Sequence, residues 1–196
     1  MSKVTRTINR LKKVIRDKNC SRMNLSTVKG YLGELLVKDH LEDEGLPVEH
    51  LGNQSGYDLQ FENLGKIVKI DVKFSVLKYE YDVEHENWGW ALLHQNKKRE
   101  SSCTHIVCVA VDDEYDVVNY YVVPRANVRL FPSSGGRFSR VSHGFLLFRD
   151  DDLRVAHESW ASLYKKSLRL LQAGKVICVG KDGRLSDALL ATLQIK

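Results

Sequence analysis

The sequence predicts a mixed α/β protein with a central β-sheet flanked by helices. Apolar residues recur at helical spacing in one segment that begins near residue 24 and in another that ends near residue 172. Between these helices, short segments alternate apolar and polar residues or are rich in valine and isoleucine, which is typical of strands. Because helices and strands are interspersed along the chain, we expect one mixed sheet with helical cover.

The composition is that of a protein with one substantial core. The chain has 196 residues, 43% of them hydrophobic, which is enough for a single domain. It lacks both a run of about 18 apolar residues and the apolar region of a signal peptide, so we expect a cytoplasmic protein without a membrane span. The four cysteines form no paired CxxC motif. We therefore expect free thiols, and a buried strand rather than a metal site in CTHIVC.

The first segment, residues 1–24, is a basic arm. It carries eight lysines or arginines against one aspartate, a net charge of +7, which leaves −2 for the rest of a chain whose overall charge is +5. Val4, Ile8, Leu11 and Ile15 recur at helical spacing and predict an amphipathic helix with one apolar stripe. The basic face is suited to a polyanion, and the alternative is a solvated helix face. The candidate nucleic-acid contacts are Arg6, Arg10 and Lys13.

The next helix is predicted from a cap at Asn24 or Ser26 to Gly45 and Pro47. Residues 57–62 and 67–75 then form a hairpin around the turn NLGK, and two further strands follow at 104–111 and 119–123. Beyond a flexible-looking loop at 131–140, the pattern predicts a helix within 150–172, a short strand at 175–180 and a final helix at 186–193. These segments divide one domain into the arm (1–24), a core (25–125) and a C-terminal helical extension (126–196).

The hairpin carries two acids that are predicted to face each other. In the second strand, Lys69, Asp71 and Lys73 point to one side, while the apolar residues between and beside them point to the other. If Leu64 and Gly65 form a two-residue turn, residues whose numbers sum to 129 lie opposite each other, and Asp58 pairs with Asp71. Two carboxylates at that separation repel unless a positive charge lies between them. A divalent cation would supply that charge.

A third acid comes from the preceding helix. Glu34 has Tyr31, Val37 and Leu41 at helical spacing around it, so it lies beside the apolar face. A carboxylate in that position is partly desolvated and needs a partner. The nearby Gly30 and Gly33 cost helix propensity, which indicates that the helix backbone approaches another element closely.

Three carboxylates and a lysine at one point suit the hydrolysis of a phosphodiester with the help of a hard cation. Mg²⁺ prefers oxygen ligands and keeps several waters, so two or three acids hold it while leaving positions for a phosphate oxygen and a water. Lys73 is then available to orient or deprotonate that water, or to neutralise charge on the phosphorus.

These residues resemble a known nuclease superfamily. GYD followed by IDVK, with an upstream helical glutamate in GELLVKDHL, is similar to the PD-(D/E)xK superfamily, and residues 29–75 resemble its Holliday-junction-resolvase-like and homing-endonuclease-like branches. The resemblance implies a restriction-endonuclease-like core. It also implies that Asp58 and Asp71 are metal ligands, Glu34 an accessory ligand and Lys73 the catalytic lysine, with Mg²⁺ as cofactor and Mn²⁺ able to substitute. Tyr57 stands where the motif's proline would be.

Each of these interpretations has a simpler alternative. Asp71 and Lys73 could belong to a solvated strand face, and Glu34 could pair with Lys38 one turn away. Trp88 and Trp90 suit a core better than a nucleotide site. The run at 96–99, with Lys97, Lys98 and Arg99, is either a second patch that contacts the DNA backbone or a solvated loop.

The sequence thus leads to the hypothesis of a Mg²⁺-dependent DNA endonuclease, either structure-specific or site-specific. The superfamily resemblance implies a homodimer, because cutting both strands normally needs two sites. The alternatives are a catalytically inactive nucleic-acid-binding protein with a nuclease fold, or a basic arm that binds a protein partner.

Overall fold

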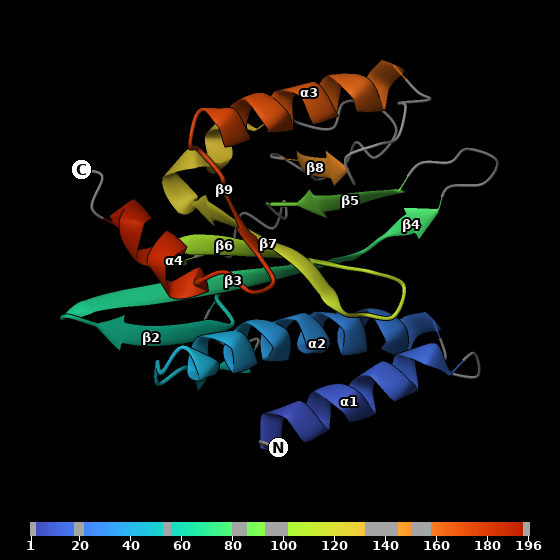
Figure 1. Ribbon diagram of the computed structural model, residues 1–196, viewed down its shortest axis with the longest axis vertical. Helices are drawn as coiled ribbons and strands as arrows, with labels where there is room; N and C mark the ends of the chain where they lie inside the picture. The colour runs from blue at the N-terminus through green and yellow to red at the C-terminus, as the bar shows by residue number, and fades with distance from the viewer. Residues whose placement is uncertain are drawn as a thin grey trace.

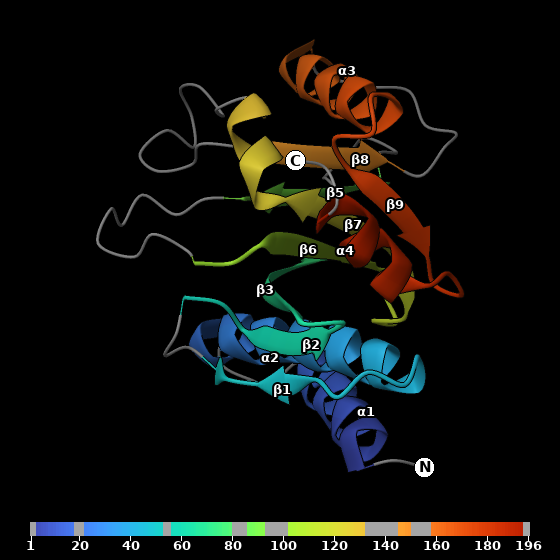
Figure 2. The same ribbon diagram turned by 90° about the vertical axis from the view of Figure 1, so that its left-hand side faces the viewer.

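A six-stranded mixed sheet forms the centre of the protein. The computed structural model describes residues 3–17, 22–52, 56–79, 86–92, 102–131, 145–149 and 158–193. The sheet has the strand order β1-β2-β3-β6-β7-β9, and a second, three-stranded sheet has the order β4-β5-β8. Helices flank both sheets (Figures 1 and 2). The expected fold class, a mixed α/β sheet with helical cover, is confirmed.

The elements have the following bounds. The helices are α1 (Lys3–Arg16), α2 (Arg22–Asp43), α3 (Glu158–Gln172), α4 (Leu185–Leu193) and the 3-10 helix η2 (Arg125–Leu130). The strands are β1 (Glu49–His50), β2 (Leu59–Asn63), β3 (Lys66–Val76), β4 (Lys78–Tyr79), β5 (Glu86–Ala91), β6 (His105–Val111), β7 (Val117–Pro124), β8 (Phe145–Arg149) and β9 (Ile177–Gly180).

Strand β3 is the centre of the arrangement because it carries both a hairpin and a crossover. It pairs antiparallel with β2 on one side and parallel with β6 on the other. Strands β7 and β9 continue the sheet in antiparallel fashion. The four strands expected from the sequence at 57–62, 67–75, 104–111 and 119–123 are present as β2, β3, β6 and β7. Neither β1 nor the second sheet was predicted from the sequence.

The two faces of β3 lie in different environments, as the alternation of its residues predicts. Val68 and Ile70 are fully buried in a core that also contains Val37 and Leu41 of α2. On the other face, the second sheet approaches, since the Gly89 N–H of β5 donates to Ser75 Oγ at 3.3 Å. Asp71 and Lys73 share the direction of Ser75, so they lie on the face toward the second sheet.

The tryptophans of β5 are core residues, as expected. Trp88 is 1% exposed and Trp90 2% exposed, in a cluster with Cys108 and Val123. Trp88 Nε1 donates to the Val111 carbonyl at 2.8 Å. This bond fixes the second sheet against β6. Burial of Cys103 and Cys108 likewise agrees with the expectation of a buried strand in CTHIVC.

Helix α2 approaches β3 closely at one of its two glycines. A Cβ added at Gly33 would lie 3.0 Å from Phe74 Cβ, whereas a Cβ at Gly30 would meet nothing within 4 Å. The expectation that each glycine marks a close approach of the helix to another element is therefore confirmed at Gly33 and wrong at Gly30. The helix also begins earlier than expected, at Arg22, so that Asn24 and Ser26 lie inside it. Its C-terminal Gly45 has a φ of +87°, which favours glycine.

Helix α1 packs on the outer side of α2, away from the sheet (Figure 1). Ile8 and Ile15 of the predicted apolar stripe are buried there. Lys12 and Arg16 form ion pairs with Asp116 and Glu114 in the turn between β6 and β7. Two of the basic residues of the arm therefore hold α1 in place.

The C-terminal part of the chain joins the main sheet. The expected strand and final helix are present as β9 and α4, and the expected long helix is α3, which begins at Glu158. Glu44 at the end of α2 accepts hydrogen bonds from the N–H groups of Leu185 (2.6 Å) and Ser186 (2.9 Å). This carboxylate caps α4, because the first N–H groups of a helix have no partner within the helix. Among the described residues, no helix is both long and apolar enough to cross a bilayer.

Candidate active site

The β2–β3 hairpin has the register predicted from its turn. Leu59 is opposite Ile70 and Asn63 is opposite Lys66, so paired residue numbers sum to 129. The turn residues Leu64 and Gly65 both have positive φ, at 51° and 75°, as a tight two-residue hairpin turn requires. Asp58 immediately precedes β2, next to the Leu59–Ile70 pair at which the paired residues end, so the expected pairing of Asp58 with Asp71 is not part of the ladder. The Asp58 carboxyl nevertheless lies close enough to Asp71 for their charges to interact.

Asp58 is held against β3 through both its backbone and its side chain. Its N–H donates to the Ile70 carbonyl at 2.8 Å, and its Oδ2 accepts the N–H of Val72 at 2.7 Å. Burial raises the pKa of Asp58 to about 6, and the charges of Asp71 and Glu34 act in the same direction, against that hydrogen bond and Lys73. An ionised Asp58 is therefore costly in the folded protein unless a further positive charge is present.

Asp71 and Lys73 form an ion pair on the same face of β3. Lys73 Nζ lies 2.6 Å from Asp71 Oδ1, and the two side chains are 20% and 15% exposed. A solvated strand face would leave both side chains much more exposed. The pair is therefore partly buried and not fully solvated.

Glu34 reaches the site from α2 and has an unexpected partner. Its Oε2 lies 2.5 Å from Nε2 of His50 in β1, and its side chain is 15% exposed. Lys38, the alternative partner, pairs instead with Glu42 at 2.6 Å. The ring of Tyr31 packs edge-on against His50, with 5.5 Å between ring centroids. Tyr31 and Glu34 thus fix the imidazole from two sides.

The four predicted residues lie close enough to interact electrostatically, because the charges of Asp71, Glu34 and Lys73 all shift the pKa of the Asp58 carboxyl. The donor set suits a hard cation such as Mg²⁺ or Mn²⁺, which prefers carboxylate oxygens. In the arrangement described, however, each carboxylate is turned toward a protein group. Within the part of the chain that the structure describes, no three His, Cys, Asp or Glu side chains are grouped closely enough to hold a metal ion.

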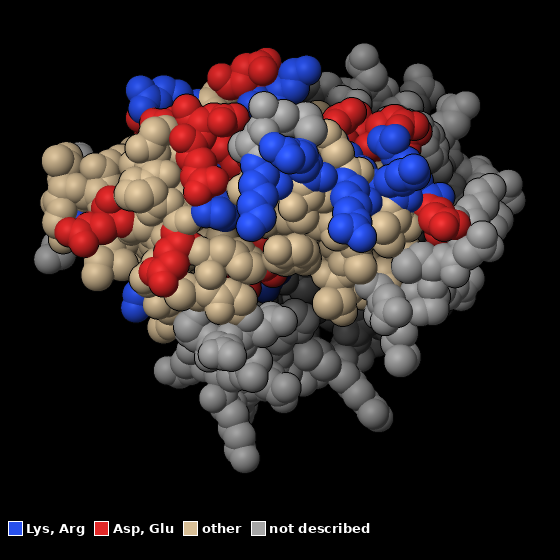
Figure 3. All heavy atoms as spheres, turned by 90° about the horizontal axis from the view of Figure 1, so that it is seen from below, with Lys and Arg blue, Asp and Glu red and all other residues tan. Residues whose placement is uncertain are grey.

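The structure describes three of the six predicted nucleic-acid contacts. Arg6, Arg10 and Lys13 are exposed on α1. Seen from below, the molecule shows a face on which lysines and arginines gather among some acidic side chains (Figure 3). No ion pair involves these three residues within the described ranges. The predicted contacts Lys97, Lys98 and Arg99 lie outside the described residues.

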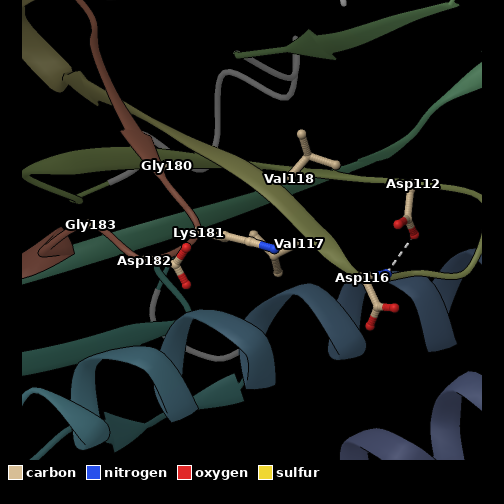
Figure 4. Close-up of a pocket in the computed structure, with 8 residues that line it drawn as sticks. All are labelled: Asp112, Asp116, Val117, Val118, Gly180, Lys181, Asp182 and Gly183. Carbon is tan, nitrogen blue, oxygen red and sulfur yellow. Dashed lines mark hydrogen bonds between the residues drawn. The ribbon is translucent and has the colours of Figure 1, made fainter.

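Two other polar regions do not belong to this site. An open pocket between the β6–β7 turn and the segment after β9 contains Asp112, Asp116 and Asp182, and shares no residue with the carboxylates above (Figure 4). His105 is buried between the hydroxyls of Thr104 (2.8 Å) and Thr192 (2.7 Å). It connects β6 to α4, and burial lowers its pKa to about 4.

Comparisons with known proteins are sparse. No protein-family model matches the chain, and no curated protein matches it. Among solved structures, the chain is similar to the bacterial homing endonuclease I-Ssp6803I, with 19% identity and a TM-score of 0.42 over 75% of this chain and 96% of that chain. The assignment of a site therefore depends on the geometry of the side chains.

Sequence reasoning missed His50, whereas it placed Lys69 on the same strand face as Asp71 and Lys73. His50 lies in a strand of only two residues, too short to be recognised from alternation. The one available signal was Glu34 itself, a half-buried acid that required a partner. Lys69 precedes Asp71 on the same strand face, and its Nζ lies 4.8 Å from the centre of the Tyr57 ring.

Proposed function

We propose that this protein is a metal-dependent endodeoxyribonuclease of the PD-(D/E)xK type. The observation that carries the proposal is the position of Asp58, which is held by hydrogen bonds to Ile70 and Val72, the two neighbours of Asp71 in β3. Burial and two acidic neighbours disfavour its ionised form. A site that concentrates negative charge in this way would bind a divalent cation, and such a cation would in turn attract a phosphate.

In this proposal, Asp58 and Asp71 hold Mg²⁺ and Glu34 is an accessory ligand. When bound, Mg²⁺ supplies a Lewis acid that neutralises charge on the phosphate. Lys73, which contacts Asp71 at 2.6 Å, orients the attacking water and stabilises negative charge on the pentacovalent phosphorus. His50 holds the Glu34 carboxylate in position from β1.

DNA is the proposed substrate, and α1 is its proposed docking element. Arg6, Arg10 and Lys13 lie exposed on one helix, where they can neutralise successive backbone phosphates. Lys12 and Arg16 do not contribute to this contact, because they hold α1 to the β6–β7 turn. We further propose a homodimer, since two active sites are needed to cut both strands together.

Cleavage assays test this function. Wild-type protein and Asp71→Ala are incubated with supercoiled plasmid, linear duplex and a four-way junction, in Mg²⁺, Mn²⁺ or EDTA. We expect metal-dependent cleavage by the wild type and a loss of roughly a hundredfold or more in Asp71→Ala. Glu62→Ala is the matched control, because Glu62 is an exposed acid on the same hairpin. Metal-dependent cleavage that survives Asp71→Ala would refute the site, and the preferred DNA form identifies the class of substrate.

A catalytically inactive nucleic-acid-binding protein is the second candidate. One observation favours it, which is that each carboxylate already has a protein partner. If this candidate is correct, the wild type binds DNA but cuts none of the three substrates with either metal.

A further inference from the structure

Lys69 lies on the same face of β3 as the proposed catalytic pair. Side chains on a strand alternate, so Lys69, Asp71 and Lys73 point in one direction. Two residues of strand span about 6.6 Å, so the ammonium of Lys69 is separate from the ion pair of Lys73 and Asp71. The backbone of Lys69 is fixed as well, because Thr104 Oγ1 contacts both its N–H and its carbonyl at 2.9 Å.

An aromatic ring positions the ammonium of Lys69. Nζ lies 4.8 Å from the centre of the Tyr57 ring, within the range of a cation–π interaction. Tyr57 is itself held, because its hydroxyl donates to Gln60 Oε1 at 3.0 Å and Gln60 Nε2 donates to Glu49 at 2.7 Å. Gln60 is also the residue directly opposite Lys69 in the hairpin. The cation is therefore held in place before any ligand arrives.

Lys69 lies on the same strand face as Lys73 but, unlike Lys73, has no carboxylate partner among the described residues. Lys12, Lys38 and Lys73 each form an ion pair with an acid, and none is found for Lys69 within the described ranges. Because no acid pairs with it among the described residues, the ammonium of Lys69 is available to an anion. Tyr57 immediately precedes Asp58, so such an anion would lie next to the proposed metal ligands.

We propose that Lys69, held against Tyr57, is a binding subsite for a nucleic-acid backbone phosphate adjacent to the phosphate that is cleaved. The subsite deepens the nuclease function proposed above and rests on it for the identity of the ligand. A lysine recognises phosphate as a point charge, without reading the base. The subsite therefore anchors the strand in the catalytic centre for any sequence.

DNA binding measured without cleavage tests this subsite. Affinity for a fluorescent duplex is measured by anisotropy in EDTA over a range of KCl concentrations. We expect Lys69→Met, which keeps the apolar stem, to weaken binding roughly tenfold. The slope of log affinity against log salt should fall by about 0.9, as for one lost phosphate contact. Lys69→Arg should restore the slope.

Lys66→Met is the matched control, because Lys66 lies on the same strand, is exposed and points to the opposite face. It should leave the salt slope unchanged. Tyr57→Leu removes the ring and keeps the charge, so it should weaken binding severalfold with the slope retained. Thermal unfolding shows whether Lys69→Met is folded. If it is not, Tyr57→Leu and Lys69→Gln provide the same test.

Equal slopes for the wild type and Lys69→Met, or equal losses in Lys66→Met and Lys69→Met, would overturn the subsite. Failure of the nuclease function gives a different result, in which DNA binding depends on Lys69 but no substrate is cut in Mg²⁺ or Mn²⁺. Cleavage by the wild type with no effect of Lys69→Met on binding leaves the nuclease intact and removes only the subsite.

Discussion

At the scale of single residues, Asp58 is the most informative group in the protein. Burial raises its pKa from 3.8 to about 6. Between pH 3.8 and about 6, the folded protein therefore binds more protons than the unfolded chain. The stabilising contribution of Asp58 is therefore fully present below its unfolded pKa and is lost as pH rises toward 6. Above pH 6 the folded protein holds an unfavourable carboxylate in the absence of a cation.

Asp58→Asn should therefore make the metal-free protein more stable at pH 8. Asparagine keeps an oxygen that can accept the Val72 N–H, while it removes the like charge beside Asp71 and Glu34. After allowance for solvent screening, we expect a gain of about 1 kcal/mol in the free energy of unfolding by urea. Cleavage activity should be lost at the same time, as expected when a functional site is replaced by a more stable one.

Two comparisons give this prediction its controls. At pH 4, where Asp58 is protonated in the wild type, the difference in stability should disappear. Glu62→Gln on the exposed side of the same hairpin should leave stability within about 0.5 kcal/mol at both pH values. An Asp58→Asn variant that is less stable than the wild type at pH 8 would show that the ionised Asp58 carboxylate does not destabilise the folded protein.

At the scale of elements, the approach of α2 to β3 sets the distance between Glu34 and the hairpin. Gly33 allows this approach, because a side chain there would collide with Phe74. Glu34 follows Gly33 directly in the chain. The glycine therefore determines how near the helix brings its carboxylate to Asp58 and Asp71.

Gly33→Ala and Gly30→Ala form a matched pair that tests this contact. The methyl group at Gly33 would lie 3.0 Å from Phe74 Cβ, an atom close to the backbone that cannot easily move. We expect Gly33→Ala to lower the free energy of unfolding by about 1–3 kcal/mol. Gly30→Ala meets nothing within 4 Å and should stabilise the protein by up to about 1 kcal/mol through helix propensity. Urea denaturation measures the free energy of unfolding of both variants. Equal changes in the two variants would show that the close approach of α2 to β3 does not depend on Gly33.

At the scale of the whole molecule, the sequence predicts the features that depend on local pattern. The register of the hairpin follows from a two-residue turn and the alternation of apolar residues, and the structure reproduces it through five residue pairs. The order of the main strands and helices follows from the same kind of signal. These features place Asp71 and Lys73 on one face, with Asp58 immediately before the start of the neighbouring strand, without knowledge of distant contacts.

The features that the sequence did not predict depend on contacts between distant segments. Strand β5 pairs with β8 more than fifty residues later, and no local pattern identifies that partner. The pairing of Glu34 with His50 depends on a strand of two residues. The ion pairs of Lys12 and Arg16 span about a hundred residues. Local charge alone could not separate these two anchors from the exposed Arg6, Arg10 and Lys13.

The protein has one cluster of charged groups around Asp58 at the β2–β3 hairpin and a separate acidic pocket at the β7–β9 edge of the sheet (Figure 4). We propose that the cluster around Asp58, and not the acidic pocket, binds a divalent cation. Anomalous diffraction from a crystal loaded with Mn²⁺ tests this claim most directly. We predict a peak between the carboxylates of Asp58 and Asp71, within reach of Glu34, that is absent in Asp71→Ala. No peak at that position, or a peak only beside Asp112, Asp116 and Asp182, would contradict the account.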